Sequence, residues 1–258
     1  MLSKPGVIFQ HGETGPPARL AEWLRERDIP FVVAHIWEEP PPDPREFAFV
    51  AVLGSVHSAA ATDPEWIPRE VDALRTAAEN DVPVLGLCFG GQALSVALGG
   101  GTDVLPAPEI GWIAVQSFDP LIPRGPWLQY HSELMRVPPG ARELARSPAG
   151  SAAFRHGPHL GLQFHPEVDG ELLDAWARRD PHLSDAGLTP EDLAAQSAAH
   201  SGPARDQAFR LFDAWLGGWA QTPSATPPCD GHASADRRPV GSGGRRSRDP
   251  GAEPEGSS

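Results

Sequence analysis

The sequence predicts an α/β fold with a mostly parallel central sheet and helices on both of its faces. Two observations carry this prediction. Short, nearly continuous apolar runs at 6–10, 47–53 and 82–87 are typical of strands buried on both sides. Between them lie segments with apolar residues at helical spacing, at 17–27 and 66–79. Strands that alternate with helices in this way indicate parallel strands joined by helical crossovers.

The remaining elements extend this pattern and then change it. A strand-like run at 31–37 stops at the proline-rich segment 40–44, and a further helix is predicted over 89–98. Beyond residue 100 the pattern becomes one of short β-like pieces, which are followed by two helical segments. The β-like pieces are 110–117, 142–146, 151–155 and 159–164, and the helical segments are 169–179 and 190–219.

Charge and composition exclude several classes of protein. The chain has 258 residues with 21 basic and 34 acidic side chains, giving a formal charge of −13. This acidic balance argues against a nucleic-acid partner, which requires a basic surface. No apolar run approaches the roughly 20 residues of a membrane span, and no secretory signal is recognisable, so we expect no membrane association and a cytoplasmic location. The two cysteines, Cys88 and Cys229, cannot build a disulfide framework.

The C-terminal segment 222–258 differs sharply in composition from the rest of the chain. It contains six Pro, six Gly and six Ser residues and no aromatic residue. Such a segment cannot bury enough apolar surface to offset the entropy lost on ordering, so it is predicted to be disordered. The folded domain is therefore expected to span 1–221.

Cys88 is the predicted nucleophile because of the turn on which it lies. A buried strand runs directly into a helix there, with Gly86 two residues before the cysteine and Gly90 two residues after it. This strand–turn–helix pattern is a nucleophile elbow, in which a strained backbone presents the central side chain above the sheet. The N-terminus of the helix lowers the pKa of a thiol placed there, and the backbone N–H of Phe89 can hold an oxyanion.

A histidine and a carboxylate that could serve this thiol follow far downstream. The apolar run 160–164 ends in His165, Pro166 and Glu167. A cysteine nucleophile needs a base to accept its proton, and that base needs a carboxylate to fix its tautomer. Pro166 interrupts strand geometry between the two residues, so we expect the carboxylate to fold back towards Nδ1 of His165.

The other histidines suggest no metal site. None has the spacing of a zinc ligand beside a thiolate or carboxylate, and the phosphate-binding pattern G-x-x-x-x-G-K-[ST] does not occur. We therefore predict neither a metal nor a cofactor. His156 and His159 flank a Gly-Pro turn and are expected to face solvent.

These motifs resemble a known family. Residues 86–92, GLCFGGQ, are similar to the G-x-C-x-G-x-Q elbow of class I (triad-type) glutamine amidotransferases, and 165–167, HPE, match that family's second motif. The segment 108–112, PEIGW, resembles the stand-alone branch that is similar to GMP synthase. The resemblance covers about 5–220 and implies a flavodoxin-like three-layer sandwich.

The resemblance also implies a reaction. Cys88 would attack the side-chain amide of glutamine and form a γ-glutamyl thioester with release of ammonia. His165 would act first as general base and then as general acid, while Glu167 orients it. Glutamate would be the second product, and ammonia would pass to an acceptor on a separate synthetase subunit.

Four further residues take their roles from the same resemblance. The oxyanion hole would be formed by the N–H groups of Phe89 and Gly54, and Gln92 and His131 would contact the substrate. The chain departs from the family at two of these places. Leu53-Gly54-Ser55 replaces a Gly-Gly-Pro segment, and His131-Ser132-Glu133 replaces a more usual His-Gly-Asp loop.

Three functions remain open at this stage. The first is a glutamine amidotransferase subunit, and the second is a hydrolase of γ-glutamyl amides or peptides on the same fold. The third is a non-catalytic regulatory module that retains the fold. The first two share the elbow and the HPE motif, whereas the intact set of catalytic residues argues against the third.

Overall fold

A computed structural model describes residues 2–181 and 183–220. The predicted tail, 222–258, lies outside the described residues, and the domain boundary at 221 stays a prediction. The strands are β1 (Gly6–Gln10), β2 (Phe31–His35), β3 (Val50–Val52), β4 (Val84–Leu87), β5 (Gly101–Ile113), β6 (Gln116–Ser117), β7 (Trp127–Arg136), β8 (Arg142–Arg146), β9 (Ser151–His156) and β10 (His159–Leu162). The helices are α1 (Ala18–Glu26), α2 (Trp66–Glu79), α3 (Phe89–Ala97), α4 (Gly170–Ala177) and α5 (Pro190–Ala220), with 3-10 turns at Pro44–Glu46 and Leu183–Ala186.

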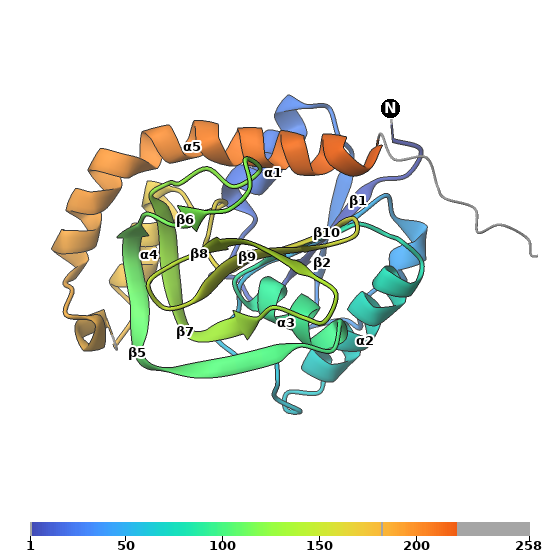
Figure 1. Cartoon of the computed structure of the whole chain (residues 1–258), viewed down its shortest axis with the longest axis horizontal. Coiled ribbons are helices and arrows are strands. Elements are labelled where there is room, and N and C mark those ends of the chain that lie inside the picture. Colours follow the sequence, from blue (N-terminus) through green and yellow to red (C-terminus); the bar gives the residue numbers. More distant parts are fainter. Residues whose placement is uncertain (1, 182, 221–258) are drawn as a thin grey trace, which may run out of the picture. The chain divides into compact units, whose positions relative to one another are not determined.

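The central sheet has eight strands in the order β2-β1-β3-β4-β10-β9-β8-β6 (Figure 1). The strands β2, β1, β3, β4 and β10 pair in parallel, and β9, β8 and β6 add an antiparallel edge. In a sheet of this kind, ligands bind beyond the carboxyl ends of the parallel strands. The elbow and the HPE motif follow β4 and β10, which are adjacent, so both are placed at that edge.

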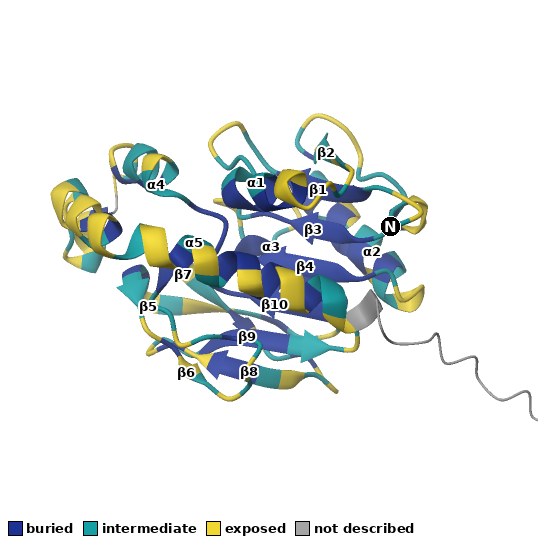
Figure 2. Cartoon of the chain, turned by 90° about the horizontal axis from the view of Figure 1, so that it is seen from above, coloured by how far each residue is buried: buried dark blue, intermediate teal, exposed yellow. Residues whose placement is uncertain are grey.

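Successive residues of the parallel strands pack into different cores on the two faces of the sheet. Ile8 joins the apolar side chains of α1 and α5, whereas its neighbours Val7 and Phe9 join those of α2 and α3. Figure 2 shows the central strands buried beneath these helices. The two-sided burial explains the continuous apolar runs of the sequence and confirms the predicted fold class.

The second sheet, an antiparallel pair of β5 and β7, departs from the sequence prediction. The β-like piece predicted at 110–117 is divided between two sheets: 110–113 end the much longer strand β5, and 116–117 form β6 of the central sheet. The strand β7 was not predicted at all. Gln129 and His131 on β7 are buried polar residues, so the strand lacks the alternation of apolar and polar residues that marks a half-buried strand. His131 therefore lies in a strand rather than in the expected loop.

The long helix α5 covers one face of the sheet with its C-terminal half and contacts α4 with its N-terminal half. In the part of the chain that the structure describes, no helix combines the length and the apolar character needed to cross a membrane.

Candidate active site

Cys88 lies between β4 and α3 in a strained backbone conformation. Its φ of 52° and ψ of −108° lie outside the regions that side chains with a Cβ ordinarily adopt. The glycines on either side make this turn possible. A Cβ on Gly86 would lie 2.3 Å from the carbonyl oxygen of Gly90, and a Cβ on Gly90 would lie 2.2 Å from that of Val52. The sequence Gly-x-Cys-x-Gly is thus the steric condition for this elbow.

His165 and Glu167 form a buried pair just beyond the carboxyl end of β10. Nδ1 of His165 is 2.8 Å from Oε1 of Glu167, and each side chain is 3% exposed. The carboxylate has folded back across Pro166, as the sequence predicts. Since Nδ1 is held by Glu167, the proton-accepting position of the ring is Nε2, which is buried and has no hydrogen-bond partner among the described residues.

The structure brings the predicted nucleophile and the predicted base together at Gly54. A Cβ built on Gly54 would lie 3.0 Å from Cε1 of His165 and 3.9 Å from Cβ of Cys88. The three residues follow three adjacent strands, β3, β4 and β10, although 111 positions separate Gly54 from His165 in the chain. Gly54 therefore lies beside both the predicted nucleophile and the predicted base, where the predicted oxyanion donor is expected.

Electrostatics favour a charged His165. Burial by itself lowers the pKa of an imidazole, but the neighbouring Glu167 carboxylate and the Cys88 sulfur outweigh burial and raise the pKa of His165 well above its ordinary value. A raised pKa means that His165 can keep a proton taken from the thiol near neutral pH. This is the electrostatic condition for a thiolate–imidazolium pair.

A cavity of about 630 Å³ opens over these groups. Cys88, His165 and Gly54 line it together with residues from β7 and from the segment after α4. Of the two residues predicted to contact substrate, both Gln92 and His131 line this cavity. No group of three or more His, Cys, Asp or Glu side chains within 2–181 and 183–220 is arranged to hold a metal ion.

Gln92 and His131 also hold the cavity wall in place. Nε2 of Gln92 donates to the carbonyl oxygen of Glu133 at 2.8 Å, so this amide group fastens β7 to α3. Nε2 of His131 lies 3.1 Å from Oε2 of Glu109 and 3.2 Å from Oε1 of Gln129. Burial raises the pKa of Glu109, but hydrogen bonds from His131, Ser147 and the Ala149 amide lower it on balance. The side chains of Gln92 and His131 thus already make hydrogen bonds to other residues of the protein.

Sequence reasoning missed three residues around the thiol. The sulfur of Cys88 lies 3.9 Å from the carbonyl oxygen of Tyr130, and Nε2 of Gln163 lies 3.8 Å from the same sulfur. The ring of Trp176 packs edge-on against His165 with centroids 5.1 Å apart. Gln163 had a detectable signal, because it is a polar residue within the apolar run that precedes His165. Tyr130 and Trp176 are placed here by β7 and α4, and no local sequence pattern predicts their position beside Cys88 and His165.

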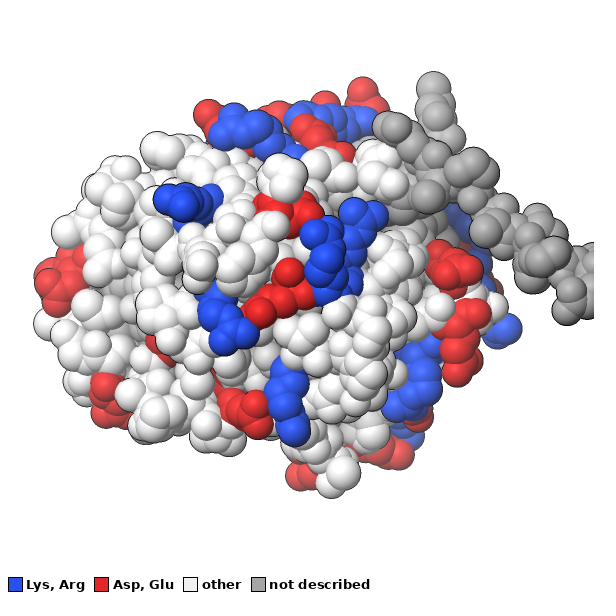
Figure 3. All heavy atoms as spheres, in the orientation of Figure 1, with Lys and Arg blue, Asp and Glu red and all other residues white. Residues whose placement is uncertain are grey.

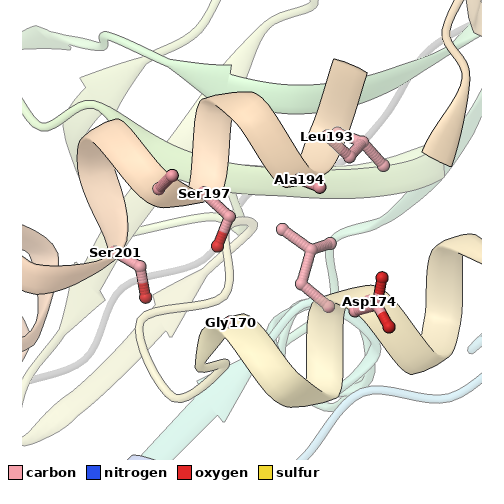
Figure 4. A pocket seen from close by; sticks show the side chains of 8 residues that line it. Gly170, Asp174, Leu193, Ala194, Ser197 and Ser201 are labelled. Atoms are coloured by element: carbon pink, nitrogen blue, oxygen red, sulfur yellow. The ribbon is translucent and has the colours of Figure 1, made fainter. Parts of the chain in front are cut away.

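A second, smaller cavity lies away from this chemistry. It measures about 300 Å³ and lies between α4 and the N-terminal half of α5 (Figure 4). Its lining is largely aliphatic, with the hydroxyl groups of Ser197 and Ser201 on one side. None of its lining residues is a cysteine or a histidine, so the larger cavity is the candidate active site.

Comparison with known proteins agrees with this site. The family model described as glutamine amidotransferase class-I matches residues 20–176, which is more than half of the chain. A glutamine-hydrolysing GMP synthase subunit from Ignicoccus hospitalis is 32% identical over 143 residues, covering 50% of this chain and 71% of that protein. A GMP synthase from Aeropyrum pernix is 33% identical over 125 residues, but the match covers only 24% of its length and 43% of this chain.

Solved structures show the same architecture. A glutamine amidotransferase from Methylobacillus flagellatus superposes with a TM-score of 0.76 at 25% identity, covering 83% of this chain and 95% of that one. One from Thermotoga maritima has a TM-score of 0.75 at 20% identity, with 83% and 98% covered, and supports the fold alone. The elbow, the buried histidine–carboxylate pair and the family match agree, and the chain belongs to the class-I glutamine amidotransferase family.

Proposed function

We propose that this protein hydrolyses the side-chain amide of glutamine through a thioester on Cys88, giving glutamate and ammonia. The observation that carries the proposal is the convergence of Cys88, on a strained elbow, with the buried His165–Glu167 pair at one cavity. Membership of the amidotransferase family supports glutamine as the substrate.

In the proposed mechanism the sulfur of Cys88 attacks the amide carbon while Nε2 of His165 accepts the thiol proton. Glu167 holds the ring so that Nε2 faces the reaction. The tetrahedral intermediate collapses with cleavage of the C–N bond, and His165 returns its proton to the leaving nitrogen, which departs as ammonia. A water molecule, deprotonated by His165, then cleaves the thioester to release glutamate and regenerate the thiol.

The oxyanion of both tetrahedral intermediates would accept hydrogen bonds from the amides of Phe89 and Gly54. Phe89 is the first residue of α3, so its N–H has no acceptor in a preceding helical turn. Gly54 lies beside both reacting side chains. Gln92 and His131 would complete the substrate pocket. Both line the cavity although their side chains also make hydrogen bonds within the protein.

The ammonia would serve an acceptor activated on a separate synthetase subunit. The Ignicoccus relative is named as one subunit of its synthase, which supports a partner of this kind. A protein partner rather than a nucleic acid also fits the surface, because acidic and basic side chains are interspersed on the face in Figure 3. We also propose a cytoplasmic location, where a thiol nucleophile stays reduced.

The test is ammonia release from glutamine by the purified full chain, with Cys88→Ala as the control. Labelling of Cys88 by a glutamine-like electrophile, with and without candidate partners, separates an enzyme from a non-catalytic module. Ammonia release no faster than in the Cys88→Ala variant, together with absence of labelling, would overturn the proposal.

The size of the cavity supports a second candidate, a γ-glutamyl hydrolase. About 630 Å³ falls within the range of pockets that take drug-sized ligands, which leaves room for a substituent on the amide nitrogen. Comparison of glutamine with γ-glutamyl peptides at equal concentration decides between the two. A kcat/KM for the peptides above that for glutamine would favour the second candidate.

A further inference from the structure

A further buried histidine–carboxylate pair reaches the same cavity through its histidine, and this histidine touches the proposed oxyanion hole. His11 follows the carboxyl end of β1, and Glu70 lies on α2. Nε2 of His11 is 2.7 Å from Oε2 of Glu70, and the two side chains are 1% and 0% exposed. Nδ1 of the same ring lies 3.1 Å from the carbonyl oxygen of Gly54.

The contact with Gly54 fixes a proton on His11. A carbonyl oxygen can only accept a hydrogen bond, so Nδ1 must carry the proton that is donated to Gly54. Nε2, the other ring nitrogen, makes the hydrogen bond with Glu70. The ring is packed between two aromatic side chains: it stacks on Trp66 with centroids 5.1 Å apart and meets Phe89 in a T-shaped contact at 4.9 Å. His11 thus contacts both residues whose amides would hold the oxyanion.

Stability alone does not account for this pair. An aliphatic replacement of a buried ion pair is often neutral or stabilising, because desolvation costs as much as the attraction returns. In addition, Oε1 of Glu70 is buried without a hydrogen-bond partner in the described part of the chain, which adds to the cost. The arrangement gains instead a rigid hold on one backbone carbonyl next to Cys88 and His165.

The loop at Gly54 needs such a hold. After β3 the chain has no regular secondary structure through Ser58, and Val56 is 97% exposed. The residue after Gly54 is Ser55, so no proline ring restricts the backbone there. The hydrogen bond from His11 fixes the plane of the Gly54–Ser55 peptide, which limits how the adjacent N–H of Gly54 can turn.

We propose that His11, held by Glu70, is a positioning residue that fixes the Gly54 loop for oxyanion binding. This inference rests on the proposed function, because an oxyanion forms only if Cys88 attacks a carbonyl group. Its effect is expected in the acyl-transfer steps and not in the reaction of Cys88 with an alkylating reagent.

Two substitutions of His11 separate its hydrogen bond from its packing. His11→Phe keeps an aromatic ring between Trp66 and Phe89 but removes both nitrogens, whereas His11→Asn keeps an N–H near the position of Nδ1. We expect His11→Phe to lower kcat for glutamine hydrolysis roughly tenfold to a hundredfold with KM changed less than about threefold. His11→Asn should recover part of that loss.

A matched pair at Glu70 tests the orienting role. Glu70→Gln can still hydrogen bond to Nε2 and hold the tautomer, whereas Glu70→Met fills the space without a polar group. Glu70→Met should therefore lose more of kcat than Glu70→Gln. His159→Phe, the same exchange at a buried histidine on the opposite end of β10, controls for the loss of a buried imidazole and should keep the wild-type kcat.

The rate of Cys88 alkylation by iodoacetamide distinguishes a specific loss of oxyanion binding from a general disturbance of the site, because only a general disturbance would change this rate. This displacement passes through no tetrahedral oxyanion, so its rate should stay at the wild-type value in His11→Phe and in Glu70→Met. A lowered kcat with unchanged alkylation supports the inference. A wild-type kcat in His11→Phe, or equal losses of hydrolysis and alkylation, would overturn it. Wild-type protein that hydrolyses neither glutamine nor a γ-glutamyl peptide would overturn the proposed function itself, and this inference with it.

Discussion

His159 and His165 are both nearly fully buried at opposite ends of one strand segment, yet their pKa values shift in opposite directions. His159 begins β10, and burial, helped by the nearby His156, lowers its pKa to about 4. His165 lies beyond the carboxyl end of β10, where Glu167 and Cys88 raise its pKa despite burial. Burial alone lowers the pKa of a histidine and favours its neutral form. A neighbouring negative charge is needed to raise the pKa of a buried histidine so that it can accept a proton near neutral pH.

The largest expected effect comes from removing the Cys88 sulfur, which lies near His165 and not near His159. Cys88→Ala should lower glutamine hydrolysis by roughly 10⁴-fold or more, because no other group can form the thioester. The fold should stay intact, since Gly86 and Gly90 still permit the turn. Ammonia release and circular dichroism check the two halves of this prediction. Residual turnover within tenfold of wild type would mean that Cys88 is not the nucleophile.

The next effect comes from the pair itself. His165→Ala should lower kcat by roughly 10³-fold or more. The loss of kcat in Glu167→Gln should be about ten times smaller, because an orienting group contributes less than the base. Steady-state kinetics on both variants give the order. A larger loss for Glu167→Gln would instead assign the dominant role to the carboxylate.

Thiol reactivity gives a smaller but direct effect. In a Cys229→Ser background, alkylation then reports Cys88 alone, since the chain has two cysteines. His165→Ala should slow alkylation of Cys88 by iodoacetamide at pH 7 about tenfold, because the proposed base that accepts the thiol proton is lost. His159→Phe is the matched control and should leave the rate unchanged. Equal rates in all three proteins would argue against a thiolate–imidazolium pair.

The smallest effects are on stability, and they should have opposite signs at the two histidines. The folded-state pKa of His159, about 4, lies below the ordinary value of 6.5, so the unfolded chain binds the proton first on acidification. Wild-type protein should therefore lose up to about 3 kcal/mol of unfolding free energy between pH 6.5 and pH 4 through this residue. His159→Phe should show a smaller acid-induced loss in urea unfolding, and an identical pH profile would contradict the buried neutral state.

For His165 the folded-state pKa is raised, so its contribution to stability is fully present below about pH 6.5 and is lost as the pH rises through the folded value. The difference in unfolding free energy between wild type and His165→Ala should therefore shrink towards alkaline pH. A difference that grows with pH would show that His165 is buried in the neutral form.

The same contrast shows where prediction from the sequence was wrong. His159 was expected to face solvent beside a Gly-Pro turn, but it is 2% exposed. The turn itself is correct, since β9 and β10 flank it as a hairpin. Whether the first residue of β10 faces solvent depends on what packs on the sheet there, which no local pattern records. His131 was expected in a loop but lies in β7, because the burial of polar residues on this strand also depends on tertiary packing.

The sequence by itself determined the alternation of strands and helices, the family and the local chemistry of the elbow. Two-sided burial leaves continuous apolar runs, and the Gly-x-Cys-x-Gly turn is dictated by steric contacts within a few residues. These features are local, so their residue patterns suffice to predict them. The roles of Gly54, Phe89, Gln92 and His131 stay predictions.

Only the tertiary structure decided which distant groups meet. The order of β1, β3, β4 and β10 in the sheet puts His11, Gly54, Cys88 and His165 at one edge, although each follows a different strand. Sheet order and the packing of α2 then carry Glu70 to His11 across 59 positions. Such contacts depend on strand register and helix packing, which hydrophobic periodicity does not encode, because it reports how each segment is buried and not against what.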